Sequence, residues 1–365
     1  MENKVIQKAG ENSQQIQAQT VIFNQGIEEI RARQIFMEMF EVTRKELSRE
    51  ATEEAKKRVL AFEDKLIKKF QKIDGALEQF ADPAFQMILT SAHKTAVSTE
   101  NDDDYLILSE LLAHRVKKGN DRKSSAGVRK AIEIVNDVTE EALLGLTVIY
   151  AWEKIVPESG VIEHGLNILD NLFSKLIYDE LPVGKEWIEN LAILNAIRIT
   201  DFKSFLKVED SYSQRLEGYS CVGIKKETET HVKALQMLKD KNMDCVLIDH
   251  ELNDGYVRLA LVEKDRIELL KRTTIDMTTG ESKTKELLKD EKEVLYQIYD
   301  MYEKNDKIHN DVKNNLKMEI RKRVNLLKLI EWVQNIKQSF DITPVGSVLA
   351  HANAQKIEEE FPALD

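Results

Sequence analysis

Residues 36–73 read FMEMFEVTRKELSREATEEAKKRVLAFEDKLIKKFQKI. Apolar side chains recur in this stretch at steps of mostly three or four residues, which places them on one stripe of an α-helix. The stripe contains Phe36, Phe40, Leu47, Ala51, Ala55, Val59, Phe62, Leu66, Phe70 and Ile73. A narrow stripe suits packing against another long helix of the same chain or of a copy; the alternative is a helix that lies on its own domain. We therefore expect a long amphipathic helix over residues 30–82.

The composition of the whole chain is that of a helical globular protein. Its 365 residues are 42% hydrophobic and 32% charged, which suits a folded core beneath a solvated surface and leaves room for two or three domains. Only five prolines and fourteen glycines interrupt the chain, so long helices are favoured over many short strands. The formal net charge of −11 argues against non-specific binding to nucleic acid. The predicted fold is mainly α, a multi-helix body with a small α+β insert.

The residues before the long helix have the period of a β-strand. Residues 12–26 read NSQQIQAQTVIFNQG, in which glutamines alternate with Ile16, Ala18 and Thr20. Such a strand needs a partner, because a lone pair of strands is marginal in water. We expect residues 1–29 to be a polar leader whose strand pairs with another copy or, alternatively, with later strands of its own chain. The residues assigned to oligomerisation are Gln15, Ile16, Gln17, Gln19, Val21 and Phe23.

Residues 83–204 are predicted to form a helical domain. Pro83 ends the long helix, because proline disfavours helical conformation in the residue before it. Asp102–Asp104 precede a strongly helical run and are interpreted as capping groups and negative charge at a helix start; the alternative is a divalent-ion site. The expected helices cover residues 84–93, 105–112, 128–135, 140–152, 161–178 and 185–197.

Residues 205–280 carry the clearest strand signals after the leader. Residues 243–250 and 255–262 are apolar runs joined by an Asn-Asp-Gly turn, which predicts a β-hairpin. A helix is expected over residues 230–240 and a further strand over 267–274. The region is therefore predicted to be a small α+β insert between two helical regions.

Residues 281–365 are predicted to be a C-terminal helical region with helices over 284–302 and 308–339. The second helix is long and amphipathic, and we expect it to be the antiparallel partner of residues 30–75. Its apolar stripe contains Leu316, Ile320, Val324, Leu327, Ile330, Val333 and Ile336. Thr343 followed by Pro344 predicts the N-cap and first residue of a last helix.

Catalytic and phosphate-binding motifs are missing from the sequence. It contains no GxxxxGK[ST] loop, no GxGxxG after a predicted strand, no HExxH and no GxSxG. Asp249–Glu251 is the nearest approach to an acid–base cluster, but successive residues of a strand point to opposite faces. Cys221 and Cys245 have no CxxC neighbour and are expected to be reduced core residues. We therefore expect no cofactor, no metal and no catalytic residues.

The sequence also bears on location. No apolar run approaches the roughly 20 residues that a membrane helix needs. Residues 1–13 are polar and lack the apolar core of a signal peptide. We expect a cytoplasmic protein that does not enter a membrane.

Several patches resemble an uncharacterised family of bacterial proteins. They are the opening Asn12-Ser13-x-x-Ile16-Gln17-Ala18, the closing Thr343-Pro344-Val345-Gly346-x-x-x-Ala350-x-Ala352-Asn353-Ala354, and residues 111–116 and 194–202. Similar leaders, usually with glycines after the alanine, open proteins of bacterial conflict and phage-defence systems; this chain has Gln19 and Thr20 there. The resemblance implies a setting in phage defence and brings no catalytic residues.

These observations leave three functional hypotheses. The first is a non-enzymatic, homo-oligomerising scaffold or sensor, in which leader strands pair between copies and stacked glutamines add hydrogen-bonded ladders. The second is an adaptor that binds a partner protein through an edge strand of residues 243–274. The third is an effector enzyme with a metal site among Asp102–Asp104 and Asp249–Glu251.

Overall fold

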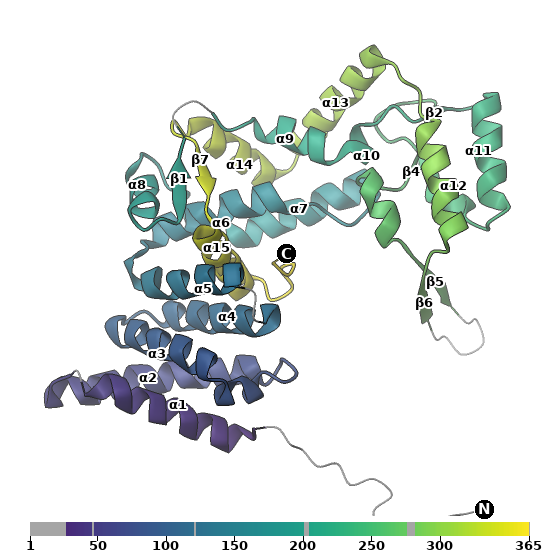
Figure 1. Ribbon diagram of the computed structural model, residues 1–365. Coiled ribbons are helices and arrows are strands. Elements are labelled where there is room, and N and C mark those ends of the chain that lie inside the picture. The colour runs from purple at the N-terminus through teal and green to yellow at the C-terminus, as the bar shows by residue number, and fades with distance from the viewer. Residues whose placement is uncertain (1–26, 46, 120–121, 201–203, 276–281, 365) are drawn as a thin grey trace, which may run out of the picture.

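The computed structural model describes residues 27–45, 47–119, 122–200, 204–275 and 282–364 (Figure 1). These residues are mainly helical and contain small sheets of two or three strands, which confirms the predicted fold class. The first half of the chain contains α1 (Glu29–Arg44), α2 (Arg49–Phe70), η1 (Leu77–Ala81), α3 (Pro83–Ser98), α4 (Asp102–Lys118), α5 (Arg122–Ile134), η2 (Val135–Asp137), α6 (Glu140–Lys154), α7 (Ile162–Leu176), α8 (Glu186–Ile193) and β1 (Ile197–Ile199).

The second half mixes helices with short strands. It contains α9 (Val208–Arg215), α10 (Glu217–Ser220), β2 (Ile224–Lys225), α11 (Glu229–Lys239), η3 (Asp244–Val246), β3 (Leu247–Asp249), β4 (Tyr256–Leu259), η4 (Lys264–Leu269), β5 (Lys271–Ile275), β6 (Ser282–Glu286), α12 (Lys289–Asp300), α13 (Asp306–Arg321), α14 (Val324–Asn335), β7 (Phe340–Ile342) and α15 (Pro344–Ile357).

The first helices form a stack with α1 at one end (Figure 1). Helix α1 packs on α2 and α3, α2 packs on α4, and α4 packs on α5. The last helix, α15, returns to this stack and packs against α4, α5 and α6. One hydrophobic core therefore runs from Ala32 near the start of α1 to Phe361 after α15, and we call this part the helical body.

The prediction of one helix over residues 30–82 is wrong, because the chain breaks between α1 and α2. Ser48 caps α2, and its side-chain oxygen accepts a hydrogen bond from the Ala51 amide at 3.3 Å. A serine at this position satisfies a helix-start amide that a continuous helix would bond to its own backbone. Beyond α2, Gly75 adopts a positive φ of 70° and leads into η1.

The helix predicted over residues 308–339 is also divided, into α13 and α14. Asp170, on α7, accepts hydrogen bonds from the backbone amides of Asn325 at 2.7 Å and Leu326 at 3.1 Å. A carboxylate from another helix thus caps the start of α14. Helix α13 packs on α9 and α10, and α14 packs on α7 and α9. The predicted antiparallel partnership with residues 30–75 is therefore wrong; α13 and α14 lie at the far end of the molecule from α1 (Figure 1).

A second hydrophobic core lies in the insert, which we call the α+β unit. Strands β2, β4 and β3 form an antiparallel sheet in that order, and β3 pairs with β4 as the predicted hairpin. Strands β5 and β6 form a separate antiparallel pair. The buried members of this core are Ile224, Ala234, Leu238, Met243, Val257, Leu259, Leu261, Ile267, Leu295 and Ile298. Because the last two lie on α12, this helix packs with the insert rather than with the C-terminal helices.

The predicted start of the last helix is confirmed. The Thr343 hydroxyl accepts a hydrogen bond from the Gly346 amide at 3.2 Å, and Pro344 is the first residue of α15. The same hydroxyl lies within hydrogen-bond distance of the Ala196 carbonyl, at 2.9 Å. A Cβ atom on Gly346 would lie 2.0 Å from the Ala196 oxygen, so only glycine permits this approach. The chain around Ala196 and the Thr-Pro-x-Gly motif therefore meet in space.

Candidate functional site

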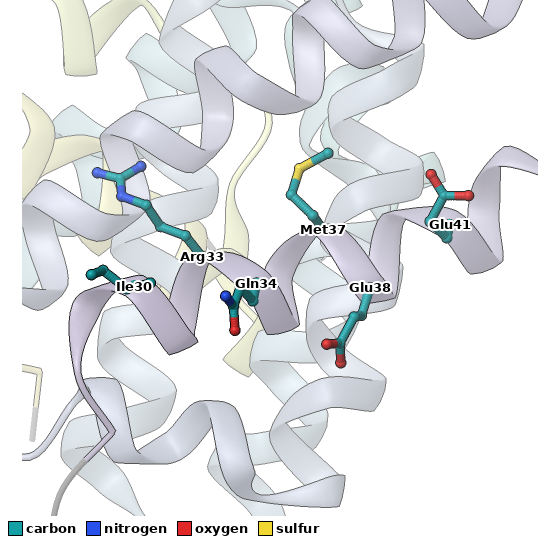
Figure 2. Close-up of a pocket in the computed structure, with 6 residues that line it drawn as sticks. All are labelled: Ile30, Arg33, Gln34, Met37, Glu38 and Glu41. Carbon is teal, nitrogen blue, oxygen red and sulfur yellow. The ribbon is translucent and has the colours of Figure 1, made fainter.

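Helix α1 presents a partly apolar face to solvent at the end of the stack. Its inward side chains, among them Phe36 and Phe40, are buried against α2 and α3. On the opposite face Ile30 is 69% exposed. A shallow groove of about 600 Å³ follows this face (Figure 2). It is lined by Ile30, Arg33, Gln34, Met37, Glu38 and Glu41.

Charged side chains border this groove. Arg33 is held at 2.9 Å by Glu29 and at 2.9 Å by Glu63 of α2. Arg31 and Glu38 form a further ion pair at 2.9 Å on the exposed surface. An apolar centre with a charged border is the composition of a protein–protein contact surface. The groove is therefore a candidate docking surface for another polypeptide.

The predicted oligomerisation residues precede this face in the chain. Gln15, Ile16, Gln17, Gln19, Val21 and Phe23 lie outside the described residues, so their pairing stays a prediction. Residue 26 joins the described chain at Ile27, two residues before α1 begins. The described chain therefore begins at the end of the stack that α1 occupies. The signal for this face in the sequence is Ile30, an apolar residue that lies off the predicted buried stripe of α1.

The three aspartates at the start of α4 supply negative charge to a helix start, as predicted. The N-cap, however, is Asn101, whose side chain accepts a hydrogen bond from the Asp103 amide at 3.0 Å. The carboxylates have separate partners, namely Lys65 for Asp102 at 3.2 Å, Lys356 for Asp103 at 2.8 Å and Thr99 for Asp104. They do not converge on a common point.

Asp249–Glu251 are likewise separated by the fold. Asp249 is exposed and pairs with Lys226 at 2.7 Å. His250 is buried, and its Nε2 lies 2.7 Å from the carbonyl oxygen of Cys221. Glu251 pairs with Arg258. The predicted opposition of faces holds for His250, but Asp249 and Glu251 do not share a site.

Arg258 joins the α+β unit to the helical body. Its guanidinium is fully buried and donates to Glu251 at 2.8 Å and to the carbonyl oxygen of Gly160 at 2.8 Å. Glu251 also accepts from the amide of Ile162, the first residue of α7, at 3.0 Å. A fully buried guanidinium with several hydrogen-bond acceptors holds one geometry, because a shift would leave its buried charge unpaired. We call Arg258, Glu251 and Gly160 the junction.

A cysteine and a histidine lie next to the junction. The Cys221 sulfur is 3.9 Å from His250 Nε2. Burial raises the pKa of the Cys221 thiol to about 12 and lowers the pKa of His250 to about 4. Both groups are therefore neutral at pH 7, whereas a nucleophilic cysteine requires the thiolate. Both cysteines are free, as expected; Cys221 is buried, but Cys245 is exposed, so the expectation that both lie in the core is wrong for Cys245.

The sequence interpretation missed a groove of lysines between α2, α4 and α15. It has a volume of about 570 Å³, and the signal in the sequence was the run of lysines at helical spacing along α2. Each lysine already holds a carboxylate. The pairs are Lys65–Asp102, Lys68–Asp64, Lys69–Glu110, Lys72–Glu359 and Lys356–Asp103. The groove is an ion-pair network that ties three helices together.

No group of three or more His, Cys, Asp or Glu side chains among the described residues is arranged to hold a metal ion. None of the helices described by the structure combines the length and the apolar character that crossing a bilayer requires.

Comparison with protein-family models gives a match over most of the chain. A protein-family model described as “:-like” matches residues 26–362. No curated protein and no solved structure matches the chain. The matched range contains every described helix and strand, from α1 to α15, so the helical body and the α+β unit lie within one family match.

Proposed function

We propose that this protein is a non-enzymatic scaffold or sensor that assembles into homo-oligomers. Over residues 26–362 the chain belongs to the family whose model it matches. The observation that carries this proposal is the outward face of α1. It ends the helical stack, exposes Ile30, and joins the leader directly. Within the described part of the chain, no helix covers this face.

The leader supplies the specific part of the assembly. Residues 15–20 alternate with the period of a strand, and strands bind through backbone hydrogen bonds that need a partner strand. Because α1 is anchored in the stack by Phe36 and Phe40, leader pairing brings whole helical bodies together.

The leader also supports a cellular setting. Its Asn12-Ser13-x-x-Ile16-Gln17-Ala18 pattern is similar to leaders of bacterial conflict proteins. We place the protein in the bacterial cytoplasm and in phage defence. Infection of cells with and without the gene tests this setting, which predicts fewer plaques on cells that carry it.

Two leader variants test the assembly. One lacks residues 1–26; the other carries Gln17→Pro and Gln19→Pro, which remove strand-forming amides. Both are expected to lower the mass measured by light scattering while the helical circular dichroism stays within a few per cent. Gln7→Pro, in the same leader but outside the proposed strand, is the matched control and should keep the full mass. Equal masses for all four chains would contradict the proposal.

A second candidate function is that of an adaptor, which the β5–β6 pair favours. In the described chain this sheet consists of two strands only, so their outer edges are available to an added strand. Leu269 and Leu288, 66% and 64% exposed, flank its base. If this pair binds a partner, Leu269→Lys with Leu288→Lys abolishes partner co-purification without changing the oligomer mass. Unchanged co-purification would count against this function.

A further inference from the structure

We infer that residues 358–364, which follow α15, form an exchangeable strap that seats either on its own helical body or on the same groove of a second copy. The inference rests on the proposed homo-oligomer, because assembly supplies neighbouring copies. It names a contact between copies that does not involve α1. It is carried by the way in which the strap is held on the body.

The strap is attached through side chains, in the manner of a docked peptide. The Glu358 amide donates to the Ala354 carbonyl oxygen of α15 at 2.8 Å. Beyond it, the backbone–backbone hydrogen bond that residues 359–364 make in the described chain stays within the strap, from the Phe361 amide to the Glu358 carbonyl oxygen at 2.9 Å. A segment that is not part of a helix or sheet opens at a lower free energy than the core does. Release of the strap therefore leaves the backbone hydrogen bonds of α15 intact.

One aromatic side chain anchors the strap in a pocket of the body. Phe361 is 3% exposed, and its ring centroid lies 5.7 Å from that of His351 and 6.4 Å from that of Tyr150. His351 Nε2 lies 2.9 Å from the carbonyl oxygen of Pro362. His351 and Tyr150 belong to α15 and α6, which pack against each other. The pocket is therefore built by the body and persists when Phe361 leaves it.

Two ion pairs fix the direction of the strap. Glu358 pairs with Lys175 of α7, and Glu359 pairs with Lys72, which lies just after α2, at 2.6 Å. Hydrogen bonds from these lysines lower the pKa of both carboxyls. Lys72, Lys175 and Glu359 are more than half exposed, so the pairs add direction but little stability. The groove thus recognises consecutive carboxylates followed by an aromatic anchor, as in Glu-Glu-Glu-Phe-Pro at residues 358–362.

A second copy supplies a segment that matches this groove at every contact. When a strap opens, it leaves both Phe361 and the pocket of Phe361 exposed to solvent. The strap of a neighbouring copy restores the same apolar burial, the same hydrogen bond and the same ion pairs, which is why exchange of an identical element is a low-cost contact between protomers. The proposed assembly raises the local concentration of straps and grooves and so favours this exchange.

Cross-linking between two differently substituted chains tests the exchange. Both carry Cys245→Ser, so that the remaining native cysteine, Cys221, is buried. One chain then receives Glu359→Cys and the other Lys72→Cys, at positions that contact each other and are exposed. Because each chain has one accessible thiol, a short bismaleimide joins the two only between copies. Lys57→Cys is the matched control, an exposed lysine farther along α2. We expect at least ten-fold more mixed dimer with Lys72→Cys than with Lys57→Cys.

The aromatic anchor gives a second readout. Phe361→Ala, added to the Glu359→Cys chain, should reduce the mixed dimer to the level of the Lys57→Cys control while circular dichroism shows an unchanged helical content. A synthetic peptide of residues 357–364 should compete with the strap and lower the yield from the original pair of chains, whereas the same peptide with alanine in place of Phe361 should not. The peptide experiment does not depend on the folding of a Phe361 variant. A yield that neither the substitution nor the peptide lowers would overturn the exchange.

The mass of the chain without residues 1–26 separates this inference from the proposed function. If that deletion lowers the mass but Lys72→Cys links no better than Lys57→Cys, strap exchange is overturned and assembly through the leader stands. If Lys72→Cys links strongly and the deletion leaves the mass unchanged, strap exchange stands and leader assembly is overturned. A full chain that is monomeric and gives no mixed dimer overturns both.

Discussion

The helical body and the α+β unit are built in opposite ways. The core of the body is closed by residues from both ends of the chain, since α15 packs against α4, α5 and α6. The core of the α+β unit is drawn from one stretch, between Ile224 and Ile298. The body thus depends on long-range contacts, whereas the unit is local and meets the body at the junction. The sequence of the α+β unit can therefore change without altering the surface of α1.

The largest expected effect comes from removing a core aromatic. Phe80 and Ile298 are both fully buried, one in each core. Phe80→Ala should lower the free energy of unfolding of the body by about 4 kcal/mol, and Ile298→Ala that of the unit by about 3 kcal/mol. Hydrogen exchange should show lost protection over α1–α8 and α15 for the first variant and over residues 224–302 for the second. Loss over the whole chain in both would contradict two separate cores.

Removing the junction arginine should have the next largest effect. Arg258→Met leaves Glu251 without its buried partner, and we expect a loss of about 3 kcal/mol in urea unfolding. Arg266→Met is the matched control, because the Arg266–Glu263 pair lies in the same unit but is about a third exposed. The free energy of unfolding of Arg266→Met should fall by less than about 1 kcal/mol. Similar losses for both variants would mean that the junction does not hold the unit.

Backbone contact at the junction gives a smaller effect. A Cβ atom on Gly160 would lie 1.9 Å from the Ala260 carbonyl oxygen, so Gly160→Ala should cost about 2 kcal/mol by forcing the unit away from the body. On α5, a Cβ atom on Gly127 would lie 3.3 Å from the Pro344 oxygen, and alanine favours the helix there. Gly127→Ala should therefore change thermal stability little. A larger loss of stability from Gly127→Ala than from Gly160→Ala would contradict this prediction.

The smallest effect concerns pH and the body alone. Burial lowers the pKa of His93 from 6.5 to about 3, and neither ring nitrogen has a hydrogen-bond partner in the described part of the chain. The unfolded chain takes up this proton more readily, so stability present at neutral pH is lost as the pH falls below 6.5. The loss at pH 5.5 is about 1 kcal/mol. His93→Leu should remove this part of the pH dependence; an unchanged slope would contradict it.

The fold was predictable where the signal is local. Thr343-Pro344 marked the start of α15, and the Asn-Asp-Gly turn marked the β3–β4 hairpin, because caps and turns are set by neighbouring residues. The division between α13 and α14 was not predictable, since its cap is Asp170, more than 150 residues earlier. The element that packs against a given helix is not predictable either, because an apolar stripe identifies the buried face but not the element that covers it.

The outward face of α1 and the junction differ in the number of elements that build them. The outward face of α1 lies on one helix, and its exposed Ile30 is an apolar residue off the predicted buried stripe. The contact between Arg258 and Gly160 was not, because 98 residues separate them and only the fold brings them together. A surface carried by one helix therefore leaves a signal in the local sequence, whereas a site assembled from several elements does not.

The mass of the full chain in solution, measured by light scattering beside that of the chain without residues 1–26, tests the central claim most directly. Assembly through the leader predicts at least twice the 42.0 kDa of one chain for the full protein and a fall toward a single chain after deletion, with helical content retained. A full protein that elutes as one chain, or a deleted chain that keeps the full mass, would contradict it.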